Sequence, residues 1–248
     1  MKRFFDPSRA LLSPSDIVSN FTGKNVQELS LPARAVITFS DGDLKRVMSR
    51  KETMVNEAWQ PFRTIHHIKE RATAITRSYF GGPNIAALVE ELAAFGVREC
   101  VLWGYCGAIS GSITIGDVII AKSALREDGV SYHYLEEDED FIESNWFEKW
   151  SCAKDDYGFR EGAIWTCDAL YRETEGKISR YRERGILGVE MEVASFYAVC
   201  RHKGIKGIAL LVVSDAFRDG IWKSGFHTKP FKEGVKHLTK FVFDKVIC

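Results

Sequence analysis

The sequence predicts an α/β protein, a single three-layer α/β/α domain built around a mixed, largely parallel central sheet. Short β-branched runs alternate along the chain with segments whose apolar residues follow helical spacing. This alternation is typical of strands joined by crossover helices, which cover both faces of a sheet. A chain of 248 residues without a Pro/Ser-rich linker or an internal repeat suits one domain, so residues 1–248 are predicted to form one unit.

Six apolar or β-branched runs are predicted to be the strands of this sheet. The last of them reads Gly-Ile-Ala-Leu-Leu-Val-Val, an unbroken apolar run of the kind found in strands buried on both faces. The predicted strands are Ala35–Phe39, Thr73–Thr76, Glu99–Leu102, Asp117–Ala121, Ala163–Thr166 and Gly207–Val213.

The helices between these strands are predicted from their end signals. Pro83 suits the first position of a helix, and Gly96 ends the apolar stripe that follows it. Met191–Lys203 forms a second helical segment, with basic residues in its last turn and Gly204 as its stop. Pro230 opens a C-terminal helix with one apolar face.

The chain ahead of the first strand is expected to be neither a signal peptide nor a membrane anchor. Asp6, Pro7 and Pro14 interrupt it before an apolar core forms. No stretch of the chain approaches the ~18 consecutive apolar residues of a membrane-spanning helix. We therefore expect residues 1–34 to be an N-terminal extension of the domain that lies at an oligomer contact.

Composition and charge exclude several classes of partner. With 45% hydrophobic and 27% charged residues, the chain has the composition of an ordinary soluble globular protein. Its 34 Lys and Arg residues balance 34 Asp and Glu residues, so no general field attracts nucleic acid or an anionic membrane. The six cysteines show no CxxC pair and no metal-ligand spacing, which indicates a reducing, cytoplasmic location and no metal. The acidic run Glu136–Asp140 is interpreted as a solvated loop.

Candidate chemistry lies where strands end, because ligands of open α/β sheets bind beyond the carboxyl ends of the strands. Directly after the first predicted strand, Gly42 allows backbone N–H groups to approach an anion, and Arg46 follows one helical turn later. The alternative is a plain β-to-α turn with a solvent-exposed arginine. After the third strand, Gly104–Ala108 places two glycines around Tyr105 and Cys106, which suits close approach to a flat or sugar-like ligand or a structural turn.

Carboxylates mark two further strand ends. Glu190 and Glu192 lie two residues apart at a strand-to-helix junction, where a pair of sugar hydroxyls is a fitting partner. Acids at a helix N-terminus are the ordinary alternative. Asp215 follows Ser214 at the end of the most apolar strand, where it either acts as a general acid or caps the next turn.

Taken together and in this order, the four segments resemble the nucleoside phosphorylase/nucleosidase family, which includes purine nucleoside phosphorylases, uridine phosphorylases and methylthioadenosine nucleosidases. Gly42–Val47 is similar to the family's phosphate-loop pattern GDPxRV, with Leu44 in place of the usual proline. Further similarity is carried by Gly81-Gly82-Pro83, Val89–Leu92, Phe95-Gly96-Val97, Ile115–Ile119, Arg126–Gly129, Arg184–Glu192 and Ser214-Asp215.

The resemblance implies roles at the sugar and at the base. Glu192 should accept the ribose 2′- and 3′-hydroxyls, Met191 should pack under the sugar, and Glu190 lies beside them. Asp215, paired with Ser214, should donate a proton toward N7 of the leaving base. Because the uridine-cleaving branch lacks this Ser-Asp pair, the expected base is a purine.

The resemblance also implies a base pocket and a phosphate site. Asp168 matches a segment that borders the base, with Leu170 or Tyr171 stacking on it, and Tyr105, Cys106 and Gly107 are the expected substrate contacts of the glycine-flanked segment. Gly42 and Arg46 should bind phosphate. The expected reaction is phosphorolysis to free base and ribose 1-phosphate, a pentosyltransferase activity of purine salvage, without a metal or organic cofactor. The expected assembly is a homo-oligomer, a dimer or a hexamer.

The sequence departs from the family at two phosphate contacts. The arginine and the hydroxyl residue that flank the central glycine in phosphorylases are here Leu102 and Tyr105. Three interpretations follow: a substitute such as Arg77, or Arg63 from another subunit, holds phosphate; water attacks instead, as in a nucleosidase; or the chain is a non-catalytic nucleoside-binding protein.

Overall fold

The structure is a computed structural model that describes residues 4–69, 71–136 and 139–247. Its helices are α1 Pro14–Thr22, α2 Asp41–Met48, α3 Gly82–Ala94, α4 Phe147–Trp150, α5 Ala153–Tyr157, α6 Glu175–Glu183, α7 Val193–His202 and α8 Lys229–Phe241, with shorter 3-10 turns η1 Glu57–Trp59, η2 Ser131–His133 and η3 Leu170–Arg172 and a final π-helical turn η4 Val242–Val246. Its strands are β1 Arg34–Thr38, β2 Thr53–Val55, β3 Ile65–Ile68, β4 Thr73–Arg77, β5 Glu99–Ala108, β6 Val118–Glu127, β7 Phe141–Glu143, β8 Arg160–Cys167, β9 Gly188–Glu190, β10 Lys206–Arg218 and β11 Ile221–Ser224.

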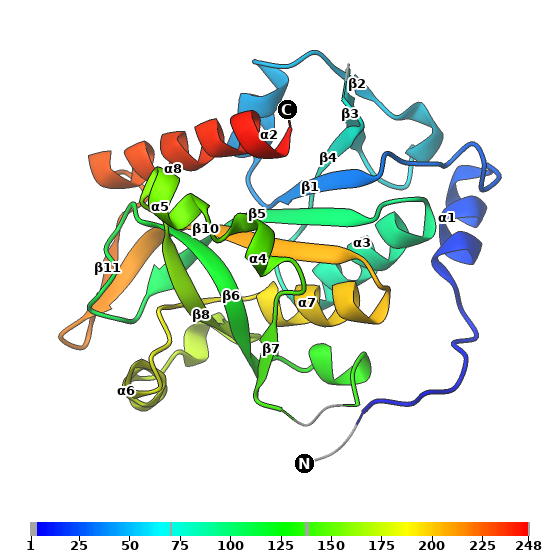
Figure 1. Ribbon diagram of the computed structural model, residues 1–248. Helices are drawn as coiled ribbons and strands as arrows, with labels where there is room; N and C mark the ends of the chain where they lie inside the picture. Colours follow the sequence, from blue (N-terminus) through cyan, green and yellow to red (C-terminus); the bar gives the residue numbers. More distant parts are fainter. Residues whose placement is uncertain (1–3, 70, 137–138, 248) are drawn as a thin grey trace.

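The sheet is mixed, as predicted, and parallel pairing is concentrated in its centre. β4, β1, β5 and β10 lie side by side and run in the same direction (Figure 1). β3 and β2 extend this centre on one side as antiparallel strands, and β11 pairs with β10 as an antiparallel hairpin. Because the central strands are parallel, their carboxyl ends meet at one edge, where the candidate residues follow them.

Half of the sheet closes on itself. β10 pairs with β6, β6 with β8, β8 with β9, β9 with the end of β5, and β5 again with β10. This ring makes β5 a shared strand: Gly107 pairs with Val189 of β9 on one side and with Asp215 of β10 on the other. The closure therefore brings two segments that are separated in the sequence to opposite sides of one glycine.

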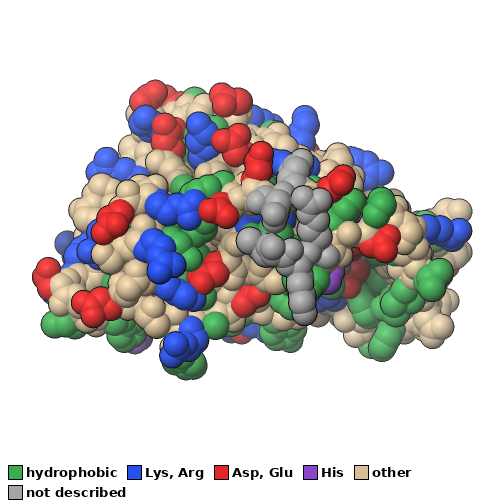
Figure 2. All heavy atoms as spheres, turned by 90° about the horizontal axis from the view of Figure 1, so that it is seen from below, with side chains coloured by type: hydrophobic (Ala, Val, Ile, Leu, Met, Phe, Trp, Pro, Cys, Tyr) green, Lys and Arg blue, Asp and Glu red, His purple; other side chains and the backbone are tan. Residues whose placement is uncertain are grey.

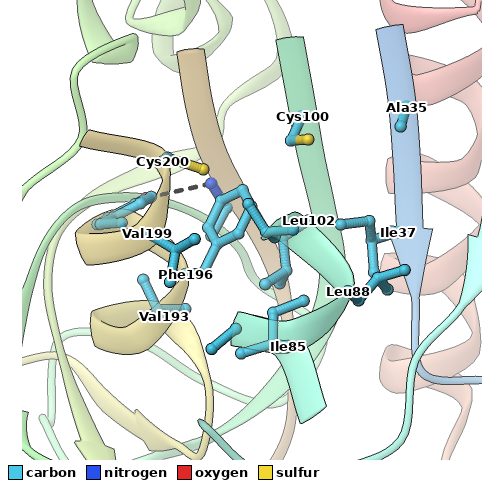
Figure 3. Packing of buried hydrophobic residues seen from close by; sticks show 14 of the residues in the cluster. Ala35, Ile37, Ile85, Leu88, Cys100, Leu102, Val193, Phe196, Val199 and Cys200 are labelled. Atoms are coloured by element: carbon cyan, nitrogen blue, oxygen red, sulfur yellow. Dashed lines mark hydrogen bonds between the residues drawn. The ribbon is translucent and has the colours of Figure 1, made fainter. Parts of the chain in front are cut away.

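Helices cover both faces of the sheet, which confirms the predicted three-layer α/β/α architecture. Alternation along β1 and β5 divides the core, because successive side chains of a strand point to opposite faces. Ile37 and Leu102 pack with α3 and α7 on one face, as Figure 3 shows. Val36 and Trp103 pack toward α2 and α8 on the other. In Figure 1, α8 and α2 accordingly lie above the sheet and α3 and α7 below it.

All six predicted strands are present, and five of them, β4, β5, β6, β8 and β10, are longer than predicted. Gly104–Ala108 was expected as a loop and is instead the second half of β5, since it pairs with β10 and β9. Asp215 was expected at a loop mouth and lies inside β10, which continues to Arg218. The prediction ended β5 before a glycine and β10 before a charged residue. In the structure, neighbouring strands on both sides keep these segments extended.

The N-terminal segment packs on the domain through α1. Val18 is fully buried in the core against α3, while Leu11 and Leu12 ahead of the helix are exposed. The predicted acidic loop Glu136–Asp140 includes residues 137–138, which lie outside the described residues; Asp140 accepts a hydrogen bond from Arg184 at 2.9 Å.

On the face shown in Figure 2, acidic and basic side chains lie interspersed, as the balanced charge of the chain leads one to expect. Within the described ranges, none of the helices is both long enough and apolar enough to cross a membrane.

Candidate active site

Glu190, at the end of β9, holds the start of helix α7. Its carboxylate accepts hydrogen bonds from the backbone N–H groups of Glu192 at 2.6 Å and Val193 at 2.8 Å, and from the hydroxyl of Thr166 at 2.5 Å. Thr166 in turn accepts the N–H of Ala194. The first N–H groups of a helix lack partners within it, so this buried carboxylate satisfies them directly. Glu190 is thus engaged by the protein itself.

Glu192 points the other way, to the loop between β4 and α3. Its Oε1 accepts the backbone N–H of Gly81 at 2.5 Å, and the residue is 6% exposed. Burial raises the pKa of the Glu192 carboxyl, and the charge of nearby Asp168 raises it further. A buried carboxylate with one oxygen bonded to the protein retains acceptor capacity for a ligand hydroxyl. Met191, between the two glutamates, is half-buried.

Asp215 lies at an irregularity of β10. The register against β5 shifts between Val213 and Asp215, which places Ser214 in a bulge and re-aims the neighbouring side chains. Ser214 donates to Oδ1 of Asp215 at 2.6 Å, and its hydroxyl lies 3.2 Å from the carbonyl oxygen of Cys106. A Cβ at Gly107 would lie 2.7 Å from Oδ2 of Asp215, so only glycine allows the carboxylate this position.

A second acid stands near Asp215. Burial, together with the charge of Asp215, raises the pKa of Glu173 to about 7. Glu173 directly follows η3, whose Leu170 and Tyr171 are 51% and 94% exposed and therefore stand free to contact a ligand rather than fill the core. Asp168, just before this turn, accepts the backbone N–H of Gly129 at 2.8 Å.

The predicted anion loop is the first turn of helix α2. Ser40 caps this helix, and the guanidinium of Arg46 lies over Gly42, since a Cβ there would be 3.4 Å from Nη1. The same Nη1 donates to Asp43 at 2.6 Å, although the Arg46 side chain remains 45% exposed. The two predicted anion-binding features, the N-terminus of α2 and Arg46, are thus both present, and the carboxylate of Asp43 is bonded to the arginine.

Tyr105 reaches this loop from β5. Its hydroxyl donates to Asp43 at 2.5 Å, and its ring packs edge-on against Phe231 of α8 at 5.3 Å. Asp43 is fully buried, and burial raises the pKa of its carboxyl against the opposing effects of Tyr105 and Arg46. Leu102, in contrast, is buried in the core on the α3 face. Tyr105 therefore contacts the predicted anion loop, while Leu102 packs in the core.

The two substitute arginines line one cavity beside α2. This cavity of about 390 Å3 is lined by Arg63, Arg77, Asp41 and neighbouring residues from the β3–β4 region. Arg77 lies 3.3 Å from Asp41, and Arg63 makes two hydrogen bonds to Glu91 of α3. Within this chain both guanidiniums already have a carboxylate partner.

Several residues of the site were not predicted. Thr166, Gly81, Asp43 and Glu173 contact or flank the candidate carboxylates only through long-range pairing, which no local pattern reveals. Trp222, whose indole N–H donates to Asp215, was also not predicted, although its hairpin has a local signal. Asp219-Gly220 between two extended runs is a strong marker of a tight β-hairpin. Across the described ranges, no three His, Cys, Asp or Glu side chains are arranged to hold a metal ion.

Comparison with known proteins places this chain in a family. A profile described as the phosphorylase superfamily matches residues 33–244, and the chain belongs to this superfamily. The structure is similar to purine nucleoside phosphorylase from Toxoplasma gondii in complex with immucillin-H, with a TM-score of 0.74, 17% identity, and coverage of 88% of this chain and 91% of the other. It is also similar to uridine phosphorylase from Vibrio fischeri, with a TM-score of 0.71, 18% identity, and coverage of 86% and 91%. At these identities the likeness concerns the fold.

Sequence relatives cover part of the chain. Guanosine phosphorylase of Halorubrum lacusprofundi is 31% identical over 136 residues, which is 54% of this chain and 56% of that protein. A DeoD-type purine nucleoside phosphorylase of Xenorhabdus nematophila is 32% identical over 158 residues, or 61% of this chain and 66% of that protein. The chain thus spans somewhat over half, and less than two thirds, of the length of these two relatives.

The burial of Glu192 predicts a pH-dependent stability. Its pKa is raised above the ordinary value of 4.5, so the folded protein binds more protons than the unfolded chain above that pH. The free energy of unfolding of the ligand-free protein should therefore fall as the pH rises from about 5 to 8, at about 1.4 kcal/mol for each unit of raised pKa.

Glu192→Gln should reduce the slope of this profile in urea titrations, leaving the part of the slope that comes from Glu190, whose pKa burial also raises. Glu148→Gln, at an exposed position, is the matched control and should follow the wild type. A Glu192→Gln profile parallel to the wild type would contradict this assignment.

Proposed function

We propose that this protein cleaves the N-glycosidic bond of a purine nucleoside by phosphorolysis, releasing the free base and ribose 1-phosphate. The observation that carries the proposal is the pairing of Gly107, which has Val189 on one side and Asp215 on the other. Two strand spacings separate the Glu190–Glu192 segment from Asp215, about 10 Å between backbones. That distance suits a nucleoside lying across Gly107, with its sugar toward Glu192 and its base toward Asp215.

The chemistry of the bond fits this placement. Cleavage builds positive charge on the ribose and negative charge on the base, so it is helped by a carboxylate near the sugar and by a proton donor at the base. In this proposal Glu192, held by Gly81, accepts the ribose hydroxyls and stabilises the developing cation. Asp215 donates its proton to N7 as the electrons of the C1′–N9 bond pass to the base.

The phosphate side of the proposal has support from α2 and from the relatives. The N-terminus of a helix and a half-exposed arginine form a suitable site for an anion, and Gly42 and Arg46 provide both. Arg77 lies beside the same turn, because its guanidinium is 3.3 Å from the carboxylate of Asp41 in that turn. The two sequence relatives compared above carry the names guanosine phosphorylase and purine nucleoside phosphorylase, which accords with phosphate as the nucleophile.

One observation favours a second candidate, hydrolysis by water. Asp43 accepts the Tyr105 hydroxyl and already pairs with the Arg46 guanidinium at 2.6 Å, so part of the positive charge that a phosphate dianion would need is neutralised within the protein. A nucleosidase would need no dianion at this position.

The products of a purine nucleoside incubated with and without phosphate decide between the candidates. Phosphorolysis predicts ribose 1-phosphate and base only in the presence of phosphate, measured by chromatography. Free ribose in the absence of phosphate would identify a nucleosidase, and no product in either case would indicate a binding protein.

Asp215→Asn tests the proton donor. If Asp215 protonates N7, the substitution should lower kcat/KM by about 10²–10⁴ for inosine, whose base is a poor leaving group, because general-acid catalysis contributes that much. A nucleoside with a good leaving group should lose far less. Losses of equal size on both substrates, with a stability decrease of about 1 kcal/mol, would instead indicate a turn-capping role.

We propose that the chain forms a homo-oligomer of the cytoplasm, with the N-terminal residues 1–34 at a contact. The exposed Leu11 and Leu12 support a contact there, and the unpaired cysteines of the described residues accord with a reducing compartment. Sedimentation at micromolar concentration should show species larger than the 28.1 kDa monomer, and a monomer alone would refute the assembly.

A further inference from the structure

A tight hairpin follows Asp215. β10 runs on to Arg218, turns through Asp219 and Gly220, and returns as β11. Both turn residues have positive φ, 53° and 72°, the conformation of the two-residue turns that match the twist of antiparallel strands. β11 lies at the edge of the molecule in Figure 1, and all four of its residues are exposed.

Trp222 of this hairpin binds the candidate proton donor. Its indole Nε1–H donates to Oδ2 of Asp215 at 2.8 Å, although the residue itself is 54% exposed. Oδ2 is also the oxygen that lies over Gly107, where the proposed nucleoside crosses the sheet. The other oxygen, Oδ1, is occupied by Ser214. The indole therefore holds the carboxylate oxygen that faces the proposed substrate.

The hydrogen bond from Trp222 to Asp215 resembles the one expected between the free purine base and Asp215 after cleavage. After cleavage, N7–H of a purine lies in the five-membered ring of a fused five–six system and donates to the Asp215 carboxylate. The Trp222 indole is also a fused five–six ring whose five-membered ring carries the N–H donor. While the indole N–H donates to Oδ2 of Asp215, that oxygen is not available to N7 of a purine. The indole must therefore leave before Asp215 can act.

We propose that Trp222 stands in the place of the leaving purine, and that a nucleoside displaces it on binding. This inference rests on the proposed function, because it takes Asp215 as the base-binding acid. The Trp222 side chain is 54% exposed, so its rotation away from Asp215 costs little core packing and leaves the pairing of β10 with β11 in place. The ligand class follows from the mimicry: a fused bicyclic base with a nitrogen in its five-membered ring, and not a pyrimidine.

Trp222→Phe tests the inference, since it retains an aromatic strand residue and removes the N–H donor. Removing an internal competitor should tighten binding of the free base hypoxanthine, lowering its Kd up to about tenfold in calorimetry, the effect expected for one hydrogen bond to a charged group. KM for inosine should fall in the same direction while kcat does not fall. Ile221→Ala, exposed on the same hairpin and without a bond to Asp215, is the matched control and should bind as the wild type does.

Fluorescence gives an independent readout. The other five tryptophans are buried, so Trp222 should dominate the emission change when hypoxanthine is added, and Trp222→Phe should abolish that change. An unchanged or higher Kd for hypoxanthine in the Phe variant would overturn the inference, because Trp222 would then not compete with the base. If hypoxanthine binds neither the wild type nor the variant, the proposed function fails with it. If the wild type turns over inosine and both proteins bind hypoxanthine equally, only the inference fails.

Discussion

The buried carboxylate of Glu190 is the interaction on which the site depends. It accepts the first N–H groups of α7 and the hydroxyl of Thr166, and so ties β8, β9 and α7 to one point. Because this carboxylate satisfies the helix start, the next acid along the chain, Glu192, is free to turn toward Gly81 and the site. Two acids two residues apart thus have different partners: Glu190 holds the start of α7, and Glu192 accepts the backbone N–H of Gly81.

The closed half of the sheet gives the site its second constraint. A flat sheet would leave the end of β5 with one neighbour, but here Gly107 has β9 on one side and β10 on the other. The absence of a side chain at Gly107 allows the Asp215 carboxylate to lie over the strand. The geometry on which the proposed glycosidic chemistry rests thus follows from a backbone pairing as much as from the acids themselves.

Prediction from sequence succeeded where the signal was local. The strands, the α7 junction and the identity of the family follow from apolar periodicity and short motifs, as with the Gly207–Val213 run. Prediction failed where neighbouring strands, rather than the segment's own residues, decide how far a strand continues. Gly104–Ala108 resembles a loop because its glycines carry no strand preference, yet ladder bonds on both sides hold it extended. Strand propensity depends on neighbours, which a single segment does not reveal.

The sequence by itself determined the class of fold, six of its strands and which acidic and basic residues are candidates for the site, because these depend on residue type and spacing. Only the tertiary structure decided which of those groups are already engaged. Glu192 meets a backbone N–H that is 111 residues away, and Tyr105 meets Asp43 across 62 residues. A hydrogen bond of about 3 Å depends on how remote segments pack. Whether a polar group faces a ligand or another part of the chain is therefore settled only when the chain has folded.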